Sequence, residues 1–142
     1  MLVDANLLIF AVHRASPLHR VAKEWLQTQL NGTRRVGLPW QSLGAFLRIA
    51  TEPRVFGSPL SPDAAWDRVS AWLSSDAAWI PQPGVRYREI LGDLLLRHQI
   101  RGNLVTDAQL AALALEHGLT VCSADTDFAR FSDLRWENPV VA

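Results

Sequence analysis

The stretch LVTDAQLAALALEHGLTVCSADTDF, residues 104–128, places a helix, a strand and three aspartates in direct succession. Thr106 and Gln109 have the spacing of a capping box, and the apolar residues after them recur every three to four positions. Gly118 stands where a left-handed helix end belongs. Residues 119–123 (LTVCS) then form an apolar run with the length of a buried strand. This order predicts a helix that leads into one strand of a parallel sheet.

The rest of the chain alternates between the same two kinds of segment. Short apolar runs predict strands at 1–3, 36–38, 78–80 and 135–137. Helices are predicted from Ser16-Pro17 to Asn31-Gly32, over 43–50 before Pro53, from Ser61-Pro62 to Leu73, and over 87–95 before Gly102-Asn103. Residues 7–13 fit a strand or a helix, and the proline-rich residues 52–62 fit a loop. We expect one α/β domain over residues 1–142, with a mainly parallel sheet and helices on both faces.

Composition narrows the possible partners and locations. The chain has 142 residues, 49% of them hydrophobic, which suffices for one buried core. Fourteen basic and fourteen acidic residues give no net charge, so nothing indicates general electrostatic binding of DNA. The single cysteine, Cys122, excludes an internal disulfide and fits a reducing compartment. The first residues make a poor signal peptide and no run approaches the roughly 20 apolar residues of a membrane span, so we expect a cytoplasmic protein without membrane contact.

Four aspartates follow predicted strands or open a predicted helix. Asp4 comes directly after the first strand, Asp125 and Asp127 follow the strand at 119–123, and Asp107 lies in the first turn of its helix. Because ligands of parallel sheets bind beyond the carboxyl ends of the strands, we expect these acids to meet at one edge. Carboxylates about 4 Å apart repel by roughly 4 kcal/mol per pair at an effective dielectric near 20. An oxygen-only cluster of this kind suits Mg²⁺ or Mn²⁺.

Each acid also has a purely structural explanation. Asp4 or Asn6 would cap the helix that follows, Asp107 would complement a helix dipole, and Asp125 and Asp127 would be ordinary turn residues. Any single acid fits these roles as well as it fits a metal site. Their common position at one predicted edge favours the metal site.

Other chemistries lack their motifs. The four histidines form no HExxH pattern, and the chain contains no GxSxG, Walker or GxGxxG sequence. A dehalogenase-type phosphatase requires DxD after the first strand, where this chain has Asp4-Ala-Asn6. A receiver domain requires a lysine beyond the last strands, and Lys23, the only lysine, lies on an early predicted helix. Trp25, Trp66 and Trp72 fall on or beside helix faces, which favours packing over base stacking for them.

Taken in order, the acidic motifs resemble those of a known family. Asp4-Ala-Asn6, Asp107 in VTDAQLAALALEHG, and TVCSADTDFARF resemble the PIN domain, and specifically the VapC ribonuclease toxins of bacterial toxin–antitoxin pairs. The resemblance implies a three-layer α/β/α fold and Mg²⁺- or Mn²⁺-dependent cleavage of RNA by metal-activated water. It also implies a homodimer and inhibition by a cognate VapB-type antitoxin. Asp4, Asp107 and Asp125 would bind the metal, Asp127 would be an additional acid of the cluster, and Asn6 and Ser123 would be supporting polar residues.

One position departs from this family. The family resemblance implies a glutamate on the helix WQSLGAFLRIAT, at the position of Ala45, and no acid lies between Trp40 and Thr51. Two alternatives follow, namely an active site with fewer carboxylates or a catalytically silent PIN-like module that binds without cutting. The four remaining acids are enough to hold one metal ion, so we expect activity. Arg48 and Arg130 lie near the motifs, but a solvent- or dimer-facing role is the simpler expectation for both.

Overall fold

The structure is a computed structural model that describes residues 1–55 and 57–141. Position 56, within the predicted loop, and position 142, at the end of the predicted domain, lie outside the described residues. At the centre is a sheet of short strands in the order β3-β2-β1-β4-β5, and all paired strands are parallel. The strands are β1 (Leu2–Val3), β2 (Val36–Gly37), β3 (Ala78–Trp79), β4 (Val121–Cys122) and β5 (Trp136–Glu137). Each one lies within a segment predicted to be a strand.

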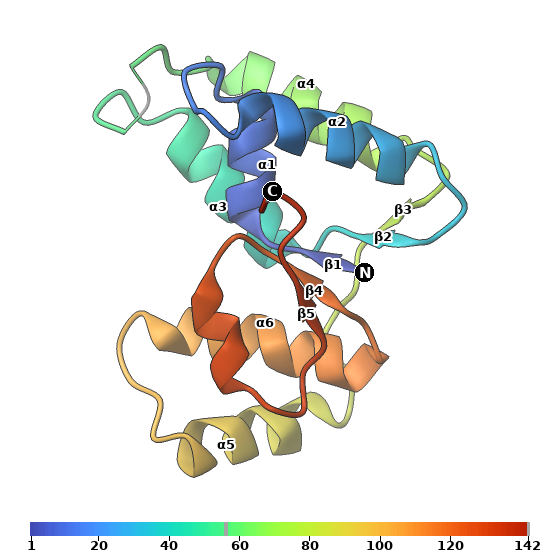
Figure 1. The fold of residues 1–142 in the computed structure, drawn as a ribbon, viewed down its shortest axis with the longest axis vertical. Helices are drawn as coiled ribbons and strands as arrows, with labels where there is room; N and C mark the ends of the chain where they lie inside the picture. Colours follow the sequence, from blue (N-terminus) through green and yellow to red (C-terminus); the bar gives the residue numbers. More distant parts are fainter. Residues whose placement is uncertain (56, 142) are drawn as a thin grey trace.

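Helices cover both faces of this sheet (Figure 1). One layer contains α1 (Ala5–Val12), α2 (His19–Leu30), α3 (Trp40–Ala50) and α4 (Pro62–Leu73), and the other contains α5 (Tyr87–Arg97) and α6 (Leu104–His117). The structure thus has three layers, α/β/α, as the sequence predicted. Within the described part of the chain, every helix is too short or too polar to cross a bilayer.

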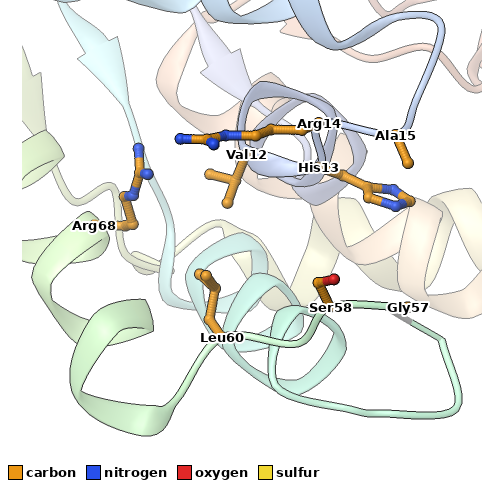
Figure 2. Close-up of a pocket in the computed structure, with 8 residues that line it drawn as sticks. All are labelled: Val12, His13, Arg14, Ala15, Gly57, Ser58, Leu60 and Arg68. Atoms are coloured by element: carbon orange, nitrogen blue, oxygen red, sulfur yellow. The ribbon is translucent and has the colours of Figure 1, made fainter.

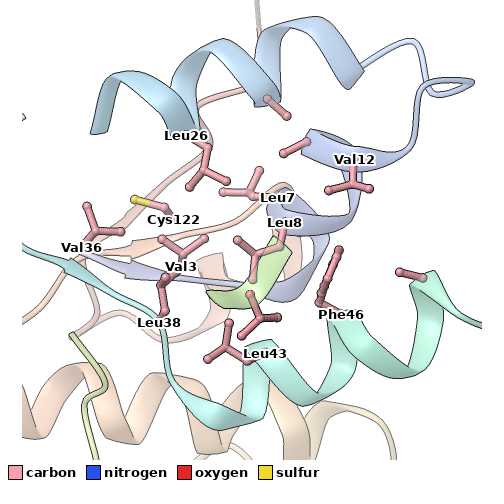
Figure 3. Packing of buried hydrophobic residues seen from close by; sticks show 14 of the residues in the cluster. Val3, Leu7, Leu8, Val12, Leu26, Val36, Leu38, Leu43, Phe46 and Cys122 are labelled. Carbon is pink, nitrogen blue, oxygen red and sulfur yellow. The ribbon is translucent and has the colours of Figure 1, made fainter. Parts of the chain in front are cut away.

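Alternating side chains of the central strands build a separate core on each face. Val3 and Cys122 pack with α1 to α4, whereas Leu2 and Val121 pack with α5 and α6. This division follows from the strand period of two, which points successive side chains to opposite faces. Figure 3 shows the first core, where Phe46 of α3 lies beside Leu8 of α1, and Leu26 of α2 lies near Leu7.

Of the ambiguous residues 7–13, all but the last are helical because Asp4 starts a helix immediately after β1, and His13 ends it in an extended conformation. The Asp4 carboxylate accepts a hydrogen bond from the backbone N–H of Ala5 at 2.7 Å. Leu7, Leu8, Ala11 and Val12 are then buried at helical spacing. The short strand and the helix cap together fix where the Asp4 side chain lies.

Two predicted helix starts are wrong. The Ser16 hydroxyl accepts from the N–H of Leu18 at 3.1 Å, so it stabilises a turn, and α2 begins only at His19. Helix α6 begins at Leu104, which places Thr106 inside the first turn and rules out a capping box with Gln109. In both cases the side chain bonds locally or lies within the helix, as short polar residues often do.

Other predicted helix ends are confirmed. The Ser61 hydroxyl caps α4 by accepting from the N–H of Ala64 at 3.1 Å. Gly118 ends α6 with a φ of 67°, a left-handed conformation that costs a glycine nothing. The reversal at Gly118 returns the chain into β4, whose end carries Ser123 and the last two aspartates.

Candidate functional site

The carboxyl ends of β1 and β4 form the centre of the candidate site. Leu2 pairs with Val121 and Val3 with Cys122, so the next residues of the two strands, Asp4 and Ser123, leave the sheet together. The N–H of Asp4 donates to the carbonyl oxygen of Cys122 at 3.0 Å. Residues 119 positions apart in the sequence therefore meet at one edge of the sheet, as predicted.

The Asp4 carboxylate is held by three hydrogen bonds. Oδ1 accepts from the N–H of Ala5, and Oδ2 accepts from Ser123 Oγ at 2.7 Å and from Asn6 Nδ2 at 3.3 Å. Burial raises the pKa of Asp4, the bonds from Ser123 and Ala5 oppose that rise, and the charge of Asp125 adds to it. Because a carboxylate has about four lone-pair positions, these bonds orient Asp4 and leave it one accepting position.

Ser123 connects the acids of the two strands. Its side chain is fully buried, and its hydroxyl donates to Asp4 Oδ2 while it accepts from Asn6 Nδ2 and from the N–H of Asp125, both at 3.0 Å. Asn6 completes the network because its Oδ1 accepts from the N–H of Ala124 at 3.2 Å. Every hydrogen-bonding position of the hydroxyl is thus used, which makes this part of the site rigid.

The other three aspartates form a cluster that is open to solvent on one side. Asp107, Asp125 and Asp127 each offer a carboxylate oxygen, and these oxygens all lie within 4.8 Å of one another. Asp107 comes from the first turn of α6, and the other two come from the 3-10 turn η1 (Thr126–Arg130) after β4. Asp125 Oδ1 also accepts from the N–H of Asp127 at 2.8 Å, so the predicted turn role and the cluster coexist in one residue.

The surroundings of Asp107 disfavour its ionised form. Burial raises its pKa to about 6, with further contributions from the negative charges of Asp125, Asp4 and Asp127. The positive charge of Arg130 acts in the opposite direction. At pH 7 most Asp107 side chains are ionised, so the cluster contains more negative charge than nearby groups neutralise.

Arg130 belongs to the site, although the sequence favoured a solvent- or dimer-facing role for it. Its Nη2 donates to Asp127 Oδ1 at 3.3 Å, and its Nε donates to the carbonyl oxygen of Asp127 at 3.1 Å. Among the described residues, it is the only basic side chain paired with any of the four acids. The (i, i+3) spacing of Asp127 and Arg130 in DFAR was the available signal.

The residues present fit a hard divalent cation. The three clustered ligand atoms are carboxylate oxygens, which suit Mg²⁺ or Mn²⁺. Cys122 does not offer a soft ligand, because its thiol is buried in the core and burial raises its pKa to about 11. A cation between Asp107, Asp125 and Asp127 would offset both the burial of the Asp107 charge and the repulsion from its neighbours, which together raise its pKa.

Helix α3 contributes an amide where an acid was expected. No acid occurs between Trp40 and Ala50, and Ala45 lies in the middle of the helix. In its first turn, Gln41 Nε2 donates to the carbonyl oxygen of Thr106 at 2.8 Å, next to Asp107. This contact joins the starts of α3 and α6. Gln41 was not predicted as a site residue, although a polar residue three positions after a predicted strand was a signal.

Known proteins support the resemblance seen in the sequence. Residues 1–134 match the sequence profile of the PIN domain. The chain belongs to the PIN domain family. This PIN domain is 43% identical to ribonuclease VapC37 of Mycobacterium tuberculosis over 138 residues, which cover 97% of this chain and 96% of that protein. It is 42% identical to ribonuclease VapC33 of the same species over 137 residues, or 96% of each chain. The predicted membership of the VapC group is therefore confirmed.

Solved structures show the same fold in more distant PIN domains. The crystal structure of Mycobacterium tuberculosis VapC20, described as a toxin that cleaves the sarcin-ricin loop, has a TM-score of 0.68 at 20% identity and covers 92% of this chain and 93% of its own. VapBC2 of Rickettsia felis, solved with a DNA fragment from its promoter, has a TM-score of 0.68 at 16% identity and covers 96% of each chain.

A hollow of about 460 Å³ lies at the opposite end of α1 from Asp4. Figure 2 shows Arg14 and Arg68 on one side of Val12 and His13 on the other. None of the lining residues that the structure describes carries a carboxylate, so this hollow does not suit a divalent cation. The aspartate cluster of the PIN domain remains the candidate site.

Proposed function

We propose that this protein is the toxin of a type II toxin–antitoxin pair and an endoribonuclease that requires Mg²⁺ or Mn²⁺. The single observation that carries the proposal is the meeting of Asp107, Asp125 and Asp127, with oxygens within 4.8 Å of one another, beside the half-buried Asp4. The full-length relatives named VapC ribonucleases support RNA as the substrate.

The four acids would have two roles in hydrolysis. Asp107, Asp125 and Asp127 would hold the ion, and Asp4 would add negative charge from behind them. When bound, the ion supplies charge neutralisation at the phosphate and acidifies water. The hydroxyl of Ser123 keeps Asp4 and the backbone of Asp125 in fixed positions, and Arg130 orients Asp127. No side chain of the site is required as the nucleophile.

The other predicted partners are part of the same proposal. The solved VapBC structures support a cognate VapB-type antitoxin that holds this toxin inactive. A homodimer, a cytoplasmic location and one domain over residues 1–142 stay predictions.

A second candidate is a catalytically silent module that binds RNA or protein. The observation that favours it is the absence of any acid from Trp40 to Ala50, including position Ala45. Gln41 occupies the start of this helix next to Asp107 and brings no negative charge. The silent module and the enzyme therefore differ in whether the four remaining acids are sufficient for cutting without an acid on α3.

Cleavage of RNA with and without divalent ions separates the two candidates. We expect the parent to cut RNA with Mg²⁺ or Mn²⁺, to stop when the ions are chelated, and to leave 5′-phosphate and 3′-hydroxyl ends. Asp107→Asn and Asp127→Asn should abolish cutting, whereas Asp67→Asn, on the exposed face of α4, should not. A parent that does not cut RNA refutes the enzyme proposal, cutting that survives both site variants refutes the assignment of the activity to these acids, and 2′,3′-cyclic phosphate ends refute water as the attacking group.

A further inference from the structure

A small groove lies at the same edge of the sheet as the aspartate cluster. Its cavity of about 230 Å³ is lined by Trp40, Tyr87, Leu113, three prolines and three glutamines. Two of the prolines directly follow the ends of strands: Pro39 comes two residues after β2, and Pro81 two residues after β3. Because all these strands are parallel, the groove and Asp4 lie beyond the same carboxyl edge.

The groove is close enough to the acids for one ligand to reach both. Neighbouring parallel strands are about 4.8 Å apart, so the ends of β2 and β3 lie roughly 5 and 10 Å from the end of β1. Gln41, which lines the groove, donates to the carbonyl oxygen of Thr106, the residue before Asp107. The groove therefore continues directly from the start of α6, where the acid cluster begins.

The chemistry of the lining suits a flat, uncharged ring system. Trp40 is 48% exposed and lies parallel to Trp66, with ring centroids 6.5 Å apart and planes 6° apart. None of the described lining residues carries a charge, and Leu113 provides a buried apolar base. Within residues 1–55 and 57–141, the side-chain amides of Gln82 and Gln109 form no hydrogen bond, so their donors and acceptors are available to a ligand.

We propose that this groove binds one unpaired base of the RNA substrate and sets the sequence preference of cleavage. Proteins recognise unpaired RNA bases by stacking them on aromatic rings and by hydrogen bonds to their edges. Trp40 and Tyr87 provide the rings, and the amides of Gln41, Gln82 and Gln109 provide hydrogen-bonding groups that can distinguish bases. A base within a duplex is excluded because its faces are stacked on neighbouring bases and its Watson–Crick edge is paired. This inference rests on the proposed ribonuclease activity and adds the form of RNA that the site takes.

Cleavage of a random-sequence RNA pool, with sequencing of the new ends, tests the groove. We expect the parent to favour one base at one fixed position near the cut. Trp40→Ala should raise KM and lower kcat/KM by roughly 10- to 100-fold and should flatten that preference. Trp40→Phe keeps a stacking ring and should retain most of the activity.

Gln109→Met tests the hydrogen-bonding part with little change in side-chain size. It should weaken the preference at the same position and raise KM. The matched control is Gln27→Met, on an exposed part of α2, which should change neither quantity. Unfolding temperatures of all variants show whether any of them is misfolded.

Three results overturn parts of this account in distinguishable ways. If the parent does not cut RNA, the proposed function itself fails. If the parent cuts, and both Trp40→Ala and Gln109→Met keep its base preference and its kcat/KM within twofold, only the groove proposal fails. If Trp40→Ala cuts normally but is no longer inhibited by the antitoxin, the groove binds protein and the base proposal is wrong.

Discussion

Replacing Asp107 by asparagine should stabilise the metal-free protein at neutral pH. Burial and the charges of Asp125, Asp4 and Asp127 raise the pKa of Asp107 from 3.8 to about 6. A rise of about two pH units corresponds to about 3 kcal/mol. Asp107 is partly exposed, and solvent screening reduces this to about 1–2 kcal/mol. Loss of its favourable place in the first turn of α6 costs about 0.3–1 kcal/mol, so relief from burying a charge beside other acids is the larger effect.

The gain must depend on pH in a defined direction. Because the pKa of Asp107 is higher in the folded than in the unfolded protein, the folded state binds more protons between about pH 4 and 6. The penalty from Asp107 is therefore fully present above pH 6 and is lost as the pH falls toward 4. Asp107→Asn should exceed the parent in free energy of unfolding by about 1 kcal/mol at pH 7 and by almost nothing near pH 4.

Urea unfolding without divalent ions at pH 7 and pH 4 measures this difference. Asp67→Asn on α4 is the control and should match the parent at both pH values. Adding Mg²⁺ at 100 times its Kd should then stabilise the parent by about 2.7 kcal/mol. Asp107→Asn should gain much less, because it lacks one carboxylate of the site. The reasoning is refuted if Asp107→Asn is less stable than the parent at pH 7 without metal, or if its advantage persists at pH 4.

Two further substitutions test the surroundings of the acids. Ser123→Ala removes the hydroxyl that joins Asp4, Asn6 and the N–H of Asp125. It should lower the free energy of unfolding by about 2–4 kcal/mol in thermal or urea unfolding, because buried polar groups lose their partner. A loss under 1 kcal/mol would contradict that role. Arg130→Gln removes the positive charge that lowers the pKa of Asp107, so the acid limb of the pH–activity profile should move to higher pH; an unchanged or lower limb would exclude this contribution of Arg130.

The sequence was sufficient to predict the sheet and the edge where the acids meet. The strands are short and apolar, and each acid follows a strand or opens a helix, so parallel pairing alone brings Asp4 and Ser123 together. Gly118 was also readable, since its position after α6 requires a left-handed backbone.

Details that depend on competing local hydrogen bonds were not predictable. Ser16 and Thr106 are residue types that often cap helices. Ser16 instead stabilises a turn, and Thr106 lies within a helix that starts two residues earlier. The sequence also did not indicate that Asp4 lies apart from the other three acids. Asp4 is held by hydrogen bonds from Ser123, on the neighbouring strand, and from Asn6, two residues further along the chain. Gln41 acquires its role only because α3 and α6 start side by side.

The most direct test of the metal site is anomalous X-ray scattering from a crystal of this protein soaked in Mn²⁺. The account predicts one or two anomalous peaks within coordination distance of Asp107, Asp125 and Asp127, and loss of the signal in Asp107→Asn. A crystal without a peak among these carboxylates, or with Mn²⁺ bound only elsewhere on the protein, would contradict the central claim.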